Sequence, residues 1–426
     1  MYRFINFKGF ADATLELRTP VTILIGRNGA GKSNVIEGMD IAAGILRGRQ
    51  LAEIGLPGDV NAAVPVRGGH AECIRKGAQS FAIGLHTGAG AVEYTFEVRR
   101  TSGKPIRSTL SVFERGHNGT ELQFDTSGES GDSVVTATSP TLGVKSWAHP
   151  GNCSILGNGG HVPHLLHDGF ALMAERLREG FGTVAVVDPV PARMRMPVRE
   201  VAGDHVRDCS NVPAALNWLA DGTATQKAQF GRIREFVARL LEQSEAKLEV
   251  MPFQGTGMVS FKIRLADVDC PATLLSDGTL HAIAVATALE IAPQGAIVCI
   301  EDIDRGVHPS QMRHLLDFVA GVAERNKLRV LLTTQNTGLL DAVNDEEMSG
   351  VVLCYWDERT KASTLVPLMD LPDAKFFIRS GHLGDAVARE LYRSRLDPDF
   401  EAKSLAGALE RMAESEAAIR EARGWK

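Results

Sequence analysis

Apolar residues recur along this chain with two different spacings. Short runs rich in β-branched residues predict buried strands at residues 21–25, 183–188, 296–300 and 329–336. Longer stretches with apolar residues three and four positions apart predict helices at residues 34–41, 167–182 and 280–289. Residues 212–248 have the pattern of two helices, broken near Asp221 and Gly222. Three of the predicted strands end in glycine, acidic or polar residues, and these strand ends carry the candidate chemistry.

Other segments have weaker or different patterns. Residues 81–85 and 92–98 predict two further strands, joined by a glycine-rich turn at residues 88–90. Residues 121–160 are rich in Gly, Ser and Thr and predict a long loop. Residues 383–426 carry helix-favouring residues of mixed charge, which predicts an exposed helical tail or a docking surface for a second protein. Heptads do not persist over several turns, so we expect no long coiled coil.

The first predicted strand leads directly into residues 26–33, which fit the pattern G-x-x-x-x-G-K-[ST]. Glycines let backbone N–H groups approach phosphate oxygens, and the helix after the loop adds its positive dipole end. Lys32 is expected to reach the β- and γ-phosphates of ATP, and the Ser33 hydroxyl to ligate Mg²⁺. The predicted nucleotide contacts of this loop are Arg27, Asn28, Gly29, Ala30, Gly31, Lys32, Ser33 and Asn34. The sequence therefore predicts an ATP–Mg²⁺ site.

A second group of motifs lies far along the chain. Ser276 is a favourable N-cap for the helix predicted to follow it, and Asp277 favours the first helical turn. The next predicted strand ends in Glu301 and Asp302, acids suited to Mg²⁺ and to an attacking water. The last predicted strand ends in polar residues that include Gln335. The chain thus presents a phosphate loop, a capped helix, an acid-tipped strand and a polar-tipped strand, in that order.

The order and residues of these motifs resemble ATPase heads of the ATP-binding-cassette (ABC) type in the RecF, SMC and OLD-nuclease group. The resemblance is greatest to the AAA-family ATPases of bacterial phage-defence loci. The matching segments are the N-terminal β-hairpin (residues 4–17), the Walker A loop (26–34), the signature motif (275–279), Walker B with the D-loop (300–309), and the switch (333–336). The resemblance covers roughly residues 1–100 and 183–375.

The resemblance implies an α/β fold, a P-loop NTPase of the ABC/RecF-like type with a two-lobed head. Such a head has a mixed sheet and an N-terminal antiparallel β lobe, here with an inserted, mainly helical or loop subdomain and a helical tail. The expected divisions are residues 1–100 and 251–375 for the two halves of the head, 101–250 for the insert, and 376–426 for the tail.

The resemblance also implies that two heads hold ATP between them, which makes the protein its own partner. The loop of one copy would face the signature residues of the other, namely Ser276, Asp277, Gly278 and Thr279. Ser33 and Glu301 would hold Mg²⁺, Asp302 would orient the attacking water, and Gln335 would sense the γ-phosphate. Relatives usually have Glu in place of Asp302 and His in place of Gln335. We therefore expect slow hydrolysis, and a scaffold that binds ATP with little or no hydrolysis is the alternative.

Composition limits the cellular setting. The chain has 426 residues, of which 44% are hydrophobic, and a net charge of −6, so its charge requires no nucleic-acid partner. No segment resembles a signal peptide or is long enough to cross a membrane. The six cysteines form no C-x-x-C pair, as is typical of a reducing compartment. We expect a cytoplasmic protein without membrane contact.

The cellular role implied by the resemblance is that of a sensor or scaffold subunit in a bacterial antiviral system. The segment after residue 336 is too short for the Toprim nuclease domain of OLD proteins, so any effector, a nuclease or a toxin, is expected to be a separate chain. The remaining alternative is a RecF-like ATPase that binds DNA. Arg193, Arg195 and Arg199 form a basic strip suited to nucleic acid, although ion pairs within the head are favoured.

Three histidines with a spacing of three residues suggest a metal site. They are His161, His164 and His167. Pro163 interrupts the helical spacing, and no cysteine or acid pair lies nearby in the sequence, so a polar surface turn is the favoured interpretation.

Overall fold

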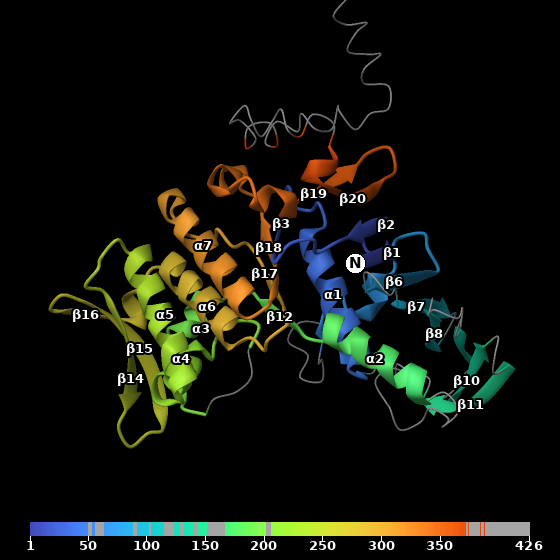
Figure 1. The fold of residues 1–426 in the computed structure, drawn as a ribbon, viewed down its shortest axis with the longest axis horizontal. Coiled ribbons are helices and arrows are strands. Elements are labelled where there is room, and N and C mark those ends of the chain that lie inside the picture. Colours follow the sequence, from blue (N-terminus) through green and yellow to red (C-terminus); the bar gives the residue numbers. More distant parts are fainter. Residues whose placement is uncertain are drawn as a thin grey trace, which may run out of the picture.

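A computed structural model gives the fold (Figure 1). The structure describes residues 1–49, 53–55, 64–87, 92–101, 104–114, 123–127, 132–139, 143–150, 167–201, 206–371, and the single residues 374, 384 and 387. The strands are β1 (Tyr2–Phe7), β2 (Phe10–Leu15), β3 (Val21–Ile25), β4 (Ile54–Gly55), β5 (Val64–Pro65), β6 (Ser80–His86), β7 (Val92–Thr101), β8 (Lys104–Glu114), β9 (Gln123–Ser127), β10 (Asp132–Ser139), β11 (Gly143–Pro150), β12 (Val184–Val187), β13 (Val198–Arg199), β14 (Lys247–Phe253), β15 (Met258–Leu265), β16 (Val268–Pro271), β17 (Ile297–Ile300), β18 (Arg329–Thr334), β19 (Val351–Asp357) and β20 (Ala362–Pro367). The α-helices are α1 (Lys32–Leu46), α2 (His167–Phe181), α3 (Pro191–Met194), α4 (Val212–Asp221), α5 (Ala224–Leu240), α6 (Asp277–Ile291) and α7 (Pro309–Arg325).

Fourteen of these strands form one mixed sheet, in the order β11-β10-β9-β8-β7-β6-β1-β2-β20-β19-β3-β18-β17-β12. The five strands from β19 to β12 are parallel to one another. Carboxyl ends of parallel strands meet at the same edge of a sheet, so the residues that follow β3, β17 and β18 come together there. The predicted α/β fold with a mixed sheet is confirmed.

Two hydrophobic cores lie on opposite faces of the parallel strands, because successive side chains of a strand point to opposite faces. Leu24 belongs to the core beneath α1 and α2, whereas Ile23 and Ile25 belong to the core beneath α4 to α7. Figure 1 shows α1 and α2 on one side of the parallel strands and α4 to α7 on the other. Burial on both faces explains why these strands are mostly apolar and do not alternate between apolar and polar residues.

The antiparallel end of the large sheet, formed by β9 to β11, differs from one prediction made from the sequence. Residues 121–160 were expected to form a loop, but they contain β9, β10 and β11. Strands β10 and β11 pair without a break from Asp132 with Pro150 to Ser139 with Gly143. The Ser- and Gly-rich composition conceals Thr and Val residues, whose β-branched side chains favour extended backbone. The expected mainly helical or loop insert is therefore wrong for the segments that form β8 to β11, which extend the sheet.

The predicted break near Asp221 is confirmed, because α4 ends at that residue. The second helix is shorter than predicted. Helix α5 ends at Leu240 and not near Leu248. Glu242 has φ of 55°, a left-handed conformation that no α-helix can continue. The following residues instead form β14, which pairs with β15 in a small separate sheet with β13 and β16.

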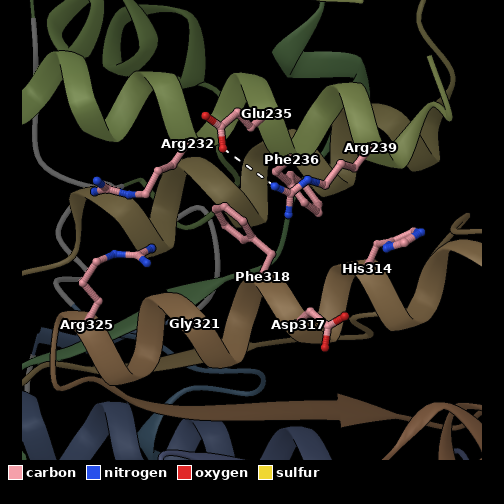
Figure 2. A pocket seen from close by; sticks show the side chains of 9 residues that line it. All are labelled: Arg232, Glu235, Phe236, Arg239, His314, Asp317, Phe318, Gly321 and Arg325. Carbon is pink, nitrogen blue, oxygen red and sulfur yellow. Dashed lines mark ion pairs between the residues drawn. The ribbon is translucent and has the colours of Figure 1, made fainter. Parts of the chain in front are cut away.

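Helices α5 and α7 pack through Phe236 and Phe318, whose ring centroids lie 4.4 Å apart. Both rings line a groove of about 220 Å³. Figure 2 shows them between the two helices. Arg232 and Arg325 at this groove pair with Glu290, which is fully buried. Both arginines thus have an acidic partner within the chain. The described residues that line the groove include no predicted site residue.

The expected domain divisions stay a prediction, and residue 100 falls inside β7. Of the predicted helical tail, only residues 384 and 387 belong to the described part. None of the helices in the described part combines the length and apolar composition needed to cross a membrane.

Candidate nucleotide-binding site

The phosphate loop connects β3 to α1 at the carboxyl edge of the parallel strands. Gly29 and Gly31 have φ of 79° and 116°, a region that disfavours every residue with a Cβ. A Cβ at Gly26 would lie 2.0 Å from the carbonyl oxygen of Cys354 in the neighbouring strand β19. The three glycines are therefore required by the backbone of the loop and by its close approach to the sheet.

Lys32 begins helix α1 and is folded back over the loop. Its Nζ donates to the carbonyl oxygens of Gly26 at 2.6 Å and Arg27 at 3.1 Å. Burial lowers the pKa of Lys32, while the field of nearby acids, Asp302 among them, opposes this shift. Because Gly31 at the N-cap has no side chain, the first N–H groups of α1 carry no side-chain cap. The ammonium and these N–H groups are the donors that a phosphate group needs.

Ser33 and Glu301 come together although they are 268 residues apart in the sequence. The Ser33 hydroxyl donates to one oxygen of Glu301 at 3.1 Å, and Arg207 donates to the other, also at 3.1 Å. Burial raises the pKa of Glu301, an effect that Asp188 strengthens and Arg207 opposes. A hydroxyl beside a carboxylate next to a phosphate loop is a donor set that fits Mg²⁺, whose other ligands are nucleotide oxygens and water.

Asp302 occupies the turn that follows β17. Its φ is 48°, and its N–H donates to the Thr333 hydroxyl at 3.0 Å, so the turn is tied to strand β18. The carboxylate pairs with Arg305 at 3.0 Å, and Arg305 also contacts Asp188 at 3.3 Å. Each of the two acids at the end of β17 is therefore paired with an arginine.

The end of β18 carries the predicted γ-phosphate sensor. Thr334 donates to Asp304 at 2.8 Å and accepts the Asn336 N–H at 3.0 Å, which fixes the backbone on both sides of Gln335. Gln335 itself is exposed. The neighbouring contact also shows what Asp304 does, since its carboxylate accepts from Thr334 and holds the switch strand.

The signature residues form the N-terminus of α6, as predicted. The Ser276 hydroxyl accepts the N–H of Thr279 at 3.1 Å, and Ser276 and Asp277 are both exposed. A Cβ at Gly278 would lie 1.9 Å from the carbonyl oxygen of Gly306, so this glycine packs directly on the turn after Walker B. Ser276 and Asp277 at the helix end are thus exposed, while Gly278 contacts Gly306 in the turn after β17.

Two arginines of the predicted basic strip form ion pairs inside the head. Arg195 pairs with Asp277 at 2.6 Å and also donates to the Leu275 carbonyl at 2.9 Å. Arg193 pairs with Asp208. These contacts confirm the ion-pair interpretation for both residues and leave fewer basic groups for nucleic acid.

The histidine spacing, for which a polar surface turn is the favoured interpretation, falls mostly outside the described residues. His161 and His164 lie outside the described residues, and His167 begins α2. Among the residues that the structure describes, no cluster of three or more His, Cys, Asp or Glu side chains is arranged to hold a metal ion.

Sequence reasoning missed Arg207, Asp40 and Arg305 as neighbours of the site. Arg207 lies outside every motif, and Asp40 is one polar position in an apolar helix. The contacts of Arg207 with Glu301 and Asp40 join segments far apart in the sequence, so no local pattern could have revealed them. Arg305, by contrast, lies only three residues after Asp302 within the predicted Walker B and D-loop segment, so its pairing with Asp302 was open to prediction.

Two family comparisons match the chain at these segments. Residues 3–130, which contain the phosphate loop, match the family described as "AAA domain". Residues 234–341, which contain the signature helix and both strand ends, match an AAA domain family whose description names the AbiEii toxin of a Type IV TA system. The two matched segments are therefore those of an AAA-type P-loop ATPase domain. No curated protein matches its sequence.

Several solved structures of SMC heads are similar to this ATPase head. An SmcHead bound to the C-winged helix domain of ScpA is 11% identical, covering 86% of this chain and 95% of that one, with a TM-score of 0.46. The SMC head domain from Thermotoga maritima is 13% identical, covering 86% and 97%, with a TM-score of 0.37. A Smc head with an extended coiled coil, bound to the C-terminal domain of ScpA derived from Pyrococcus furiosus, is 9% identical, covering 86% and 94%, with a TM-score of 0.43. At these identities and TM-scores, neither their partners nor their functions carry over to this chain.

Proposed function

We propose that this head binds ATP with Mg²⁺ and that two copies close around the nucleotide. The observation that carries the proposal is the meeting of Ser33 and Glu301 at 3.1 Å beside Lys32 and the uncapped start of α1. Lys32 and the backbone N–H groups of residues 27–34 hold the phosphates, while Arg27 and Asn34 contribute further polar contacts. Mg²⁺, when bound by Ser33 and Glu301, neutralises phosphate charge.

The exposed end of α6 supports closure around the nucleotide by a second copy. Ser276 and Thr279 present hydroxyl groups at a helix N-terminus, where an anion is favoured. Leu274, two residues before Ser276, is 74% exposed, as expected for an apolar residue at a surface that becomes covered. In an isologous dimer each signature segment, Ser276 to Thr279, faces the phosphate loop of the other copy, so both sites form together.

Hydrolysis is proposed to be slow. Asp302 orients the attacking water, but its carboxylate is paired with Arg305 in this structure. Asp302 is also one methylene shorter than the Glu of relatives, and Gln335 donates a hydrogen bond without carrying a charge. Both differences reduce the stabilisation of the transition state.

We further propose that ATP-dependent closure controls a separately encoded effector, a nuclease or toxin, in antiviral defence. The match of residues 234–341 to the AbiEii-related family supports this role. The test is co-purification with the products of neighbouring reading frames, with and without ATP, and absence of any nucleotide-dependent partner would count against it.

The central experiment measures molar mass by light scattering with and without ATP and Mg²⁺. Asp302→Asn, which slows hydrolysis, is expected to double its mass when ATP is added. Adding Ser276→Arg to that variant should keep it monomeric, because the bulky cation blocks the composite site. Adding Ser349→Arg, at an exposed serine before β19 and away from the carboxyl edge, should leave the dimer intact.

Binding and closure are separable in this experiment. Lys32→Ala should weaken the binding of a fluorescent ATP analogue by about a hundredfold or more, as expected for loss of a charged hydrogen bond to phosphate. Unchanged binding would refute the nucleotide site. Normal binding with no change in mass would refute the dimer alone.

A further inference from the structure

Arg207 lies at the point where the metal site and helix α1 meet. Its guanidinium donates to Glu301 at 3.1 Å and to the carbonyl oxygen of Pro65 at 3.4 Å, and it lies 3.8 Å from Asp40. The second oxygen of Glu301 accepts from Ser33. Arg207 therefore holds one oxygen of the carboxylate that, in the proposed function, binds Mg²⁺.

Three carboxylates lie near Arg207, so a positive charge between them is stabilising. Glu301 and Asp40 are each only 14% exposed, and Asp188 adds a third carboxylate nearby. Burial raises the pKa of Asp40 to about 6, and Arg207 is the main group that opposes this shift. Arg67 also acts on Glu301, but its guanidinium is bound to Glu37 on α1. Without Arg207, the buried carboxylates would lack their closest positive partner, which is costly in a partly desolvated site.

We propose that Arg207 is a positioning residue that stands in for the metal ion, balancing Glu301 in the nucleotide-free head until a divalent cation displaces it. The inference rests on the proposed Mg²⁺ site. A guanidinium and a divalent cation on one carboxylate repel each other at a separation of a few ångströms. Binding of Mg²⁺ with nucleotide therefore favours release of Arg207 from Glu301.

The backbone around Arg207 connects this exchange to the signature motif. The N–H of Asp188 donates to the Arg207 carbonyl at 2.8 Å, and the N–H of Val190 donates to the Asp208 carbonyl at 3.0 Å. Asp208 also holds Arg193 in helix α3, which ends next to Arg195. Arg195 in turn donates hydrogen bonds to the Asp277 carboxylate and to the Leu275 carbonyl. Displacement of Arg207 is thus transmitted through α3 to the helix end that meets the second copy.

The first test measures Mn²⁺ binding to the nucleotide-free protein by electron paramagnetic resonance. Arg207→Gln, which keeps hydrogen bonding but removes the charge, should bind Mn²⁺ at least about tenfold more tightly than the natural protein. Arg207→Lys, which keeps the charge, is the matched control and should stay near the natural affinity. Glu301→Gln should abolish the gain when combined with Arg207→Gln.

The outcomes separate the inference from the function on which it rests. If Glu301→Gln weakens Mn²⁺–ATP binding but Arg207→Gln leaves Mn²⁺ affinity unchanged, the counter-ion role is wrong and the metal site stands. If Glu301→Gln has no effect on Mn²⁺–ATP binding, the proposed metal site is wrong and the inference falls with it.

A second measurement needs no Arg207 variant and therefore does not depend on its folding. Hydrogen exchange of the Asp188 and Val190 amides is followed in the natural protein, with and without Mn²⁺–ATP. Release of Arg207 should speed exchange of both amides by at least about threefold, since their acceptors are the carbonyls of the moving segment. Unchanged protection at saturating Mn²⁺–ATP would overturn the proposed displacement.

Discussion

At the scale of single residues, each of the two acids after β17 is paired with an arginine side chain. Glu301 is shared between Ser33 and Arg207, and Asp302 is paired with Arg305. The Asp302 pair lies at a half-exposed surface, where an ion pair contributes little to stability. Its consequence is therefore for reactivity, because the Asp302 carboxylate must separate from Arg305 before it can orient a water molecule.

The two departures from the family pattern give a prediction at this scale. Asp302→Glu combined with Gln335→His should raise ATP turnover by about tenfold or more, because the longer carboxylate reaches the water and the imidazole carries charge. Steady-state phosphate release measures the effect. Asp345→Glu, at an exposed loop acid, is the control and should change nothing. Equal, near-zero turnover in all three proteins would identify the head as a switch that only binds ATP.

At the scale of elements, helix α6 joins the signature motif to the turn after β17. His281 lies one turn into this helix, is fully buried, and neither of its ring nitrogens has a hydrogen-bond partner among the described residues. Burial lowers the pKa of His281 to about 4, and the nearby Arg305 acts in the same direction. The helix therefore carries a neutral imidazole next to the turn that follows β17.

This imidazole predicts how stability depends on pH. Between about pH 6.5 and pH 4 the unfolded chain binds a proton at His281 and the folded chain does not, so the free energy of unfolding falls as pH decreases through this window. The loss for this group amounts to about 3 kcal/mol at the acid end of the window. Urea unfolding at pH 7 and pH 4.5 should show that His281→Leu loses less stability than the natural protein.

The matched control for this prediction is His314→Leu, because His314 is exposed on α7. Its pH dependence should follow that of the natural protein. A His281→Leu curve parallel to the natural one would mean that His281 binds its proton equally in both states.

At the scale of the whole molecule, one sheet carries both halves of the proposed site. Its parallel strands deliver the phosphate loop and the acids to one edge, and α6 presents Ser276 outward beside them. A single copy exposes the signature residues and the phosphate loop separately. The proposed function therefore requires each copy to complete the site of the other.

A mixing experiment tests this complementarity. Lys32→Ala lacks the phosphate-loop cation, and Ser276→Arg blocks the signature segment, so neither variant alone should form a working site. In a mixed dimer one site is doubly altered and the other is intact. An equal mixture should regain about a quarter of the natural ATP turnover if copies assort randomly and sites act independently. If the mixture is as inactive as its components, the two motifs do not act across an interface.

The sequence by itself determined the features that depend on nearby residues. Gly29 and Gly31 of the phosphate loop adopt positive φ, Ser276 caps α6, and the strands that lead into the phosphate loop and into Glu301 form as predicted, because each is set by local backbone preferences and hydrophobic spacing. Only the tertiary structure decided which distant groups meet. The strands within residues 121–160, the contact of Arg207 with Glu301 and the burial of His281 arise from pairing and packing between remote segments, and no local pattern specifies those contacts.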